Sequence, residues 1–60
     1  MKAQINYEEH NIQINKNLDI LKEKLKKHKS KFKNNPTNWG YVGDLEFVLN
    51  KLIEINQFLK

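Results

Sequence analysis

The feature that most constrains this chain is one interruption, at residues 34–44, between two segments with helical spacing of apolar residues. The interruption reads Asn-Asn-Pro-Thr-Asn-Trp-Gly-Tyr-Val-Gly-Asp and holds the only proline, the only tryptophan and both glycines of the sequence. Proline and glycine interrupt helices, and the segments on either side contain neither. A single break between two helices predicts an all-α antiparallel helical hairpin.

The segment before the break carries residues, all but two of them apolar, spaced alternately four and three apart, which is the pattern of a coiled coil. We call these positions the seam: Tyr7, Asn11, Ile14, Leu18, Leu21, Leu25, His28 and Phe32. Asn6 followed by Glu9 is close to a capping box, so we expect the first helix over about residues 6–33 and fraying of residues 1–5. The alternative is two short strands, residues 5–7 and 12–14, joined by a turn at residues 8–11.

We expect a corner at residues 34–37 and a second helix over about residues 38–59. The residue before proline avoids helical backbone, and asparagine tolerates the left-handed conformation that ends many helices. Thr37 or Asn38 can then cap the second helix. A later start, at Asp44, is the alternative, because Gly40 and Gly43 weaken a helix. The second helix continues the four-three spacing at Tyr41, Leu45, Val48, Leu52, Ile55 and Leu59, widened by Val42, Leu49 and Ile53.

The hairpin should pack as a single domain with a small core. In that core Leu18, Leu21, Leu25 and Phe32 face Leu45, Val48, Leu52 and Ile55. A domain of 60 residues buries too little surface to be comfortably stable alone, and without cysteine it has no disulfide. We therefore expect a homodimer with a four-helix arrangement. Its candidate interface is the part of the first helix that outruns the second: Tyr7, Asn11, Ile12 and Ile14.

The sequence contains no recognisable catalytic motif. One serine, no cysteine and two histidines exclude the usual nucleophilic triads, and no glycine-rich phosphate loop is present. We expect no enzyme activity, no cofactor and no metal. No apolar run reaches the length that spans a bilayer, so we expect no membrane partner and a cytoplasmic location.

The lysines define the charge of the chain. Eleven lysines and no arginine stand against seven acids, giving a net charge of +4. Helical spacing sorts most of them into a first lysine row, Lys22, Lys26, Lys29 and Lys33, and a second lysine row, Lys24, Lys27 and Lys31. Such rows can meet phosphates or an acidic protein surface, or they can simply be the solvated shoulders of an amphipathic helix. The absence of arginine argues against sequence-specific nucleic-acid recognition.

The aromatic and glycine residues after the proline form a second candidate binding surface, Trp39, Gly40, Tyr41 and Gly43. In a helix the two glycines share a face with Phe47, and their missing side chains leave a notch that a partner could enter. The alternative is that the notch only admits the first helix or Trp39 at a tight corner.

Residues 35–45, Asn-Pro-Thr-Asn-Trp-Gly-Tyr-Val-Gly-Asp-Leu, resemble a block found in very small helical-hairpin proteins of bacteriophages and other mobile elements. The resemblance implies a protein of the bacterial host cytoplasm that binds and blocks a host protein, including anti-phage defence proteins. We therefore expect a homodimeric protein-binding module, an inhibitor or adaptor, whose larger partner has an acidic surface. The alternative is a nucleic-acid-binding hairpin that places its lysine rows on phosphates.

Overall fold

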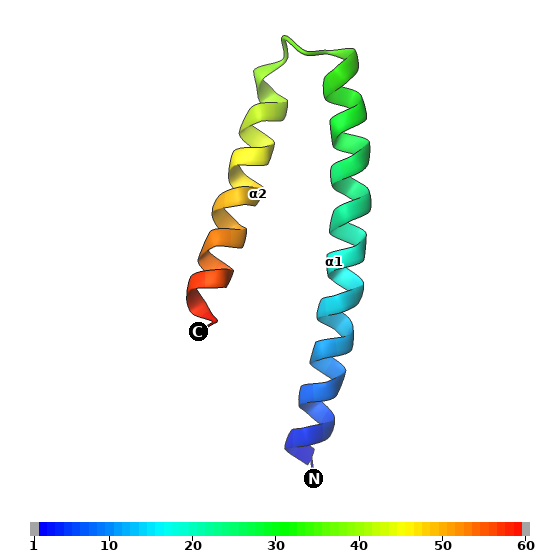
Figure 1. Cartoon of the computed structure of the whole chain (residues 1–60), viewed down its shortest axis with the longest axis vertical. Coiled ribbons are helices and arrows are strands. Elements are labelled where there is room, and N and C mark those ends of the chain that lie inside the picture. The colour runs from blue at the N-terminus through cyan, green and yellow to red at the C-terminus, as the bar shows by residue number, and fades with distance from the viewer. Residues whose placement is uncertain (1, 60) are drawn as a thin grey trace.

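A computed structural model describes residues 2–59, which form two helices and a short connection (Figure 1). Helix α1 spans Lys2–Asn34 and helix α2 spans Trp39–Phe58. The described residues contain no strand, so the all-helical class expected from the spacing of apolar residues is confirmed. The alternative of two strands before residue 15 is contradicted, because that segment is continuous helix.

Helix α1 begins earlier than its sequence indicates, at Lys2 rather than near Asn6. The expected fraying of residues 2–5 is therefore wrong, and Met1 lies outside the described residues. Nothing at Lys2, Ala3 or Gln4 opposes a helix, because all three are strong helix formers. Asn6 is not a cap here: its carbonyl oxygen lies 2.6 Å from Nδ1 of His10, one turn later.

The connection between the helices is closed by backbone hydrogen bonds. The N–H of Asn35 donates to the carbonyl oxygens of Lys31 (3.1 Å) and Phe32 (3.0 Å), and the N–H of Asn38 donates to Asn35 (3.1 Å). No residue in the described part of the chain has a positive φ, so the left-handed asparagine expected at this point is not formed. Proline at position 36 ends the helix by itself, since it disfavours helical backbone at Asn35.

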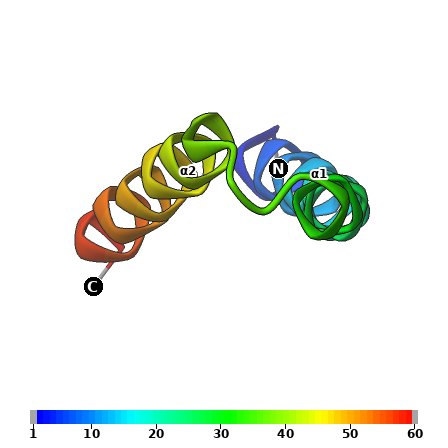
Figure 2. The same ribbon diagram turned by 90° about the horizontal axis from the view of Figure 1, so that it is seen from above.

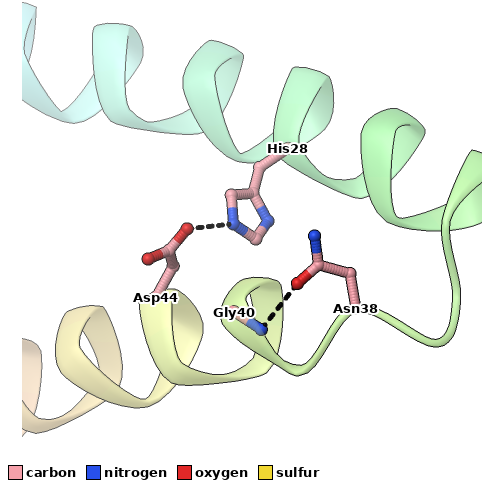
Figure 3. A network of polar contacts seen from close by, with 4 residues as sticks. All are labelled: His28, Asn38, Gly40 and Asp44. Atoms are coloured by element: carbon pink, nitrogen blue, oxygen red, sulfur yellow. Dashed lines mark hydrogen bonds and ion pairs between the residues drawn. The ribbon is translucent and has the colours of Figure 1, made fainter.

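Asn38 starts helix α2. Its backbone is extended (φ −86°, ψ 102°), and its Oδ1 accepts a hydrogen bond from the N–H of Gly40 at 2.9 Å (Figure 3). The early start therefore holds and the alternative start at Asp44 does not. Both glycines lie inside the helix, because the cap and the apolar spacing outweigh their low helix propensity.

The two helices run antiparallel but do not close on each other. Helix α2 moves away from α1 toward its C-terminal end, and the N-terminal turns of α1 continue past it (Figures 1 and 2). The molecule is elongated, 53 × 21 × 12 Å. Tertiary contact is therefore concentrated near the connection.

The expected core is not formed, because no side chain of residues 2–59 is buried. Leu18, Leu45 and Ile55, expected in the core, are 44–54% exposed. The physical reason is the splay of the helices, which leaves two helical surfaces too far apart to cover one another. The half-buried side chains nevertheless all belong to the predicted apolar stripes: Leu21, Leu25, His28, Phe32, Tyr41, Val48 and Leu52.

Candidate protein-binding surface

The contacts that hold the hairpin centre on His28. Its Nε2 lies 3.1 Å from Oδ2 of Asp44, so the imidazole bridges the two helices (Figure 3). Tyr41 stacks edge-on against His28, with ring centroids 5.2 Å apart, and against Phe32 at 6.4 Å. The His28 side chain is 20% exposed, the Asp44 carboxylate 66%. His28 is thus a structural residue of the seam, and no sequence pattern indicates that Asp44 is its partner.

Beside these contacts lies an open apolar groove between the helices, which we call the corner groove. It has a volume of about 570 Å³. Its walls are the apolar side chains of both helices, with one lysine at the rim: Leu25, His28, Lys29, Phe32, Tyr41, Val42 and Leu45. Val42 and Leu45 are exposed. The sequence pattern placed them on the apolar stripe, but a packed core would have filled this space.

The aromatic and glycine residues are presented to solvent. Trp39 is 80% exposed and lies at the first position of α2. A Cβ built on Gly43 meets nothing within 4 Å, whereas one on Gly40 would lie 3.0 Å from Oδ1 of Asn38. The notch at Gly43 is therefore not occupied by α1 or by Trp39, which removes the purely architectural explanation for that glycine. Phe47 is exposed on the same face, with Nζ of Lys51 5.5 Å from its ring centroid.

Both lysine rows lie on the exposed surface of α1. Within the described part of the chain, the single ion pair made by these lysines joins Lys26 to Glu23 at 3.5 Å, between side chains that are both mostly exposed. A pair in that environment contributes little to stability. The lysines thus keep their charge available to a partner, and Lys29 places one of them at the rim of the corner groove.

The N-terminal half of α1 has no intramolecular cover. Tyr7 is 74% exposed, and Asn11, Ile12 and Ile14 are exposed as well. These are the candidate dimer residues, and the segment 7–14 that contains them lies near or beyond the end of α2 (Figure 1). Candidate residues for a larger partner, by contrast, extend from Lys22 in the middle of α1 to the connection and the first turns of α2.

Three further findings bear on the class of site. Among residues 2–59, no group of three histidine, cysteine, aspartate or glutamate side chains is arranged to hold a metal ion. Over the same residues, neither helix is long and apolar enough to cross a membrane. In comparisons with known proteins, no family model, no curated protein and no solved structure matched this chain.

Proposed function

We propose that the chain is a non-enzymatic protein-binding module that acts as a homodimer and inhibits or adapts a larger host protein. One observation carries the proposal: both helices display apolar stripes, yet no side chain of residues 2–59 is buried. Burial of apolar surface is the main favourable contribution to folding, at about 25 cal/mol per Å². A hairpin that leaves its stripes exposed gains its stability by covering them with another molecule.

The two ends of the hairpin suit two different partners. The N-terminal half of α1 offers Tyr7, Ile12 and Ile14 to a second copy. The other end offers Trp39 with the open face at Gly43, and exposed tryptophan is the side chain most enriched among residues that dominate binding energy. The first lysine row adjoins this end and favours a partner with an acidic surface.

The resemblance of residues 35–45 to small proteins of phages and mobile elements supports a bacterial host protein as the target. A protein of an anti-phage defence system belongs to that class. On this proposal the dimer acts in the bacterial cytoplasm by occupying a functional surface of its target. It needs no chemistry of its own.

Affinity capture from a nuclease-treated bacterial lysate tests this proposal. We expect the tagged chain to retain a defined protein, and Trp39→Ala to reduce that retention by at least about tenfold. Phe58→Ala is the matched control, because Phe58 is an equally exposed aromatic residue (82%) at the far end of α2. Equal retention by both variants and the parent chain would contradict the assignment of Trp39, and loss of all capture after nuclease treatment would contradict a protein target.

The second candidate function is nucleic-acid binding, which the exposure of both lysine rows favours. If lysines neutralise phosphates, affinity falls by roughly one log unit per log of salt for each phosphate contacted. We expect instead that the chain shows no sub-micromolar affinity for DNA or RNA at physiological salt. Tight, salt-dependent binding that is lost on combining Lys26→Glu with Lys29→Glu would establish the nucleic-acid function in place of the protein-binding one.

A further inference from the structure

We propose that the two α1 helices of the homodimer pair antiparallel, so that residues 7–14 of each copy lie in the corner groove of the other. The inference rests on the homodimer proposed above and specifies its geometry. Each copy has an uncovered apolar segment at one end of α1 and an open apolar groove at the other. A two-fold axis across the middle of α1 brings each segment to the other copy's groove.

The charges of α1 select the antiparallel orientation. Residues 22–33 hold seven lysines and one glutamate, whereas residues 2–20 hold three acids, Glu8, Glu9 and Asp19, against two lysines. A parallel pair would place the two lysine-rich segments side by side, and like charges at that distance repel. An antiparallel pair places each lysine-rich segment beside the acidic half of the other helix.

The seam then pairs with itself in one register along its whole length. The seam alternates between two kinds of position, a and d. In an antiparallel coiled coil, each a position of one helix lies opposite a d position of the other helix. With Leu18 opposite the partner's Leu21, every layer is matched: Ile14 meets the partner's Leu25, Asn11 meets the partner's His28, and Tyr7 meets the partner's Phe32. The two polar residues of the seam therefore face each other, and a slide by one heptad would put a polar residue opposite leucine.

The pairing of Asn11 with the partner's His28 is chemically consistent. A carboxylate accepts hydrogen bonds, so the Nε2 of His28 that lies 3.1 Å from Asp44 carries the proton in the neutral imidazole. Nδ1 is then an acceptor. The side-chain amide of Asn11 supplies the donor that this nitrogen needs, while the His28–Asp44 bridge stays intact.

The residues beside the seam are also consistent with docking of residues 7–14 in the partner's corner groove. Lys29, at the groove rim, follows His28 in the sequence, and Glu8 follows Tyr7, so both stand on the same flank of their seams. In the register above, Glu8 approaches the partner's Lys29. Ile5 and Ile12 lie on this flank too, where the exposed Val42 of the partner's α2 can contact them.

Disulfide trapping tests the orientation, because the natural chain has no cysteine. Positions 14 and 25 lie about 16 Å apart on one helix, beyond the reach of a disulfide, so only two chains can link them. We expect an oxidised mixture of Ile14→Cys and Leu25→Cys chains to form disulfide-linked dimers. Each variant oxidised alone should form no disulfide-linked dimer. Linking of Ile14→Cys with itself would show a parallel pair and overturn the proposal.

Charge reversal provides a second, independent readout. Glu8→Lys should weaken dimerisation about tenfold, and adding Lys29→Glu should restore it to within about threefold. Glu9→Lys is the matched control, since it makes the same charge change on the outer face and should alter dimerisation little. Equal weakening by both single variants would overturn the register.

Sedimentation of the unmodified chain distinguishes failure of the antiparallel geometry from failure of the homodimer. A dimer that does not form the mixed cross-link refutes only the geometry, whereas a monomer refutes the homodimer as well.

Discussion

Asn38 and His28 are the two polar residues on which the shape of the hairpin most depends. Asn38 fixes where α2 begins, because its side chain satisfies the N–H of Gly40, one of the groups left without a partner at a helix start. His28 fixes where α2 lies against α1, through Asp44 and the ring of Tyr41. Both act at the connection, which explains why the helices are held there and are free to separate further along.

The cap leads to the prediction at the residue scale. Asn38→Ala removes the acceptor for the Gly40 N–H and should lower the free energy of unfolding by about 1 kcal/mol. Thr37→Ala is the control, because Thr37 was the other candidate cap and should change stability by less than about 0.5 kcal/mol. Urea unfolding followed by circular dichroism, at one fixed protein concentration, compares the two. An effect of Thr37→Ala equal to that of Asn38→Ala would contradict the cap.

At the scale of the elements, the sequence predicts the two helices and the stripes that face each other, because apolar spacing and the single proline are local signals. It mispredicts the start of α1, since Asn6 has the form of a cap but the preceding residues favour helix just as well. The corner groove and the His28–Asp44 bridge could not be read from the sequence. They depend on the angle between the helices, which no local pattern encodes.

Alanine substitutions at the two glycines of α2 distinguish a structural role from a role in partner binding. Gly43→Ala should raise the free energy of unfolding by about 0.5–1 kcal/mol, because the new methyl group meets open space and alanine favours a helix. Gly40→Ala should gain less, because its Cβ crowds Oδ1 of Asn38. If the open face at Gly43 receives a partner, the stabilised Gly43→Ala chain should also lose retention of that partner. A destabilised Gly43→Ala chain in circular dichroism would contradict the open space.

At the scale of the whole molecule, the expectation that a hairpin core would form within one chain is not met, because the facing side chains are at most half-buried. The helices carry more apolar surface than one antiparallel contact can cover, and the uncovered part is divided between the N-terminal half of α1 and the exposed flank of α2. Two copies can cover both surfaces with each other. The proposed homodimer would give these apolar stripes a partner that a monomer lacks.

The most direct test of the homodimer combines sedimentation equilibrium with thermal unfolding over a range of dilutions. We predict a mass of two chains of 7.2 kDa each at micromolar concentration, and a melting temperature that falls on dilution. Ile14→Asp should raise the dissociation constant at least about a hundredfold, because it places a charge in the interface, while Ile20→Asp, off the seam, should not. A single-chain mass with a melting temperature independent of dilution would contradict the account.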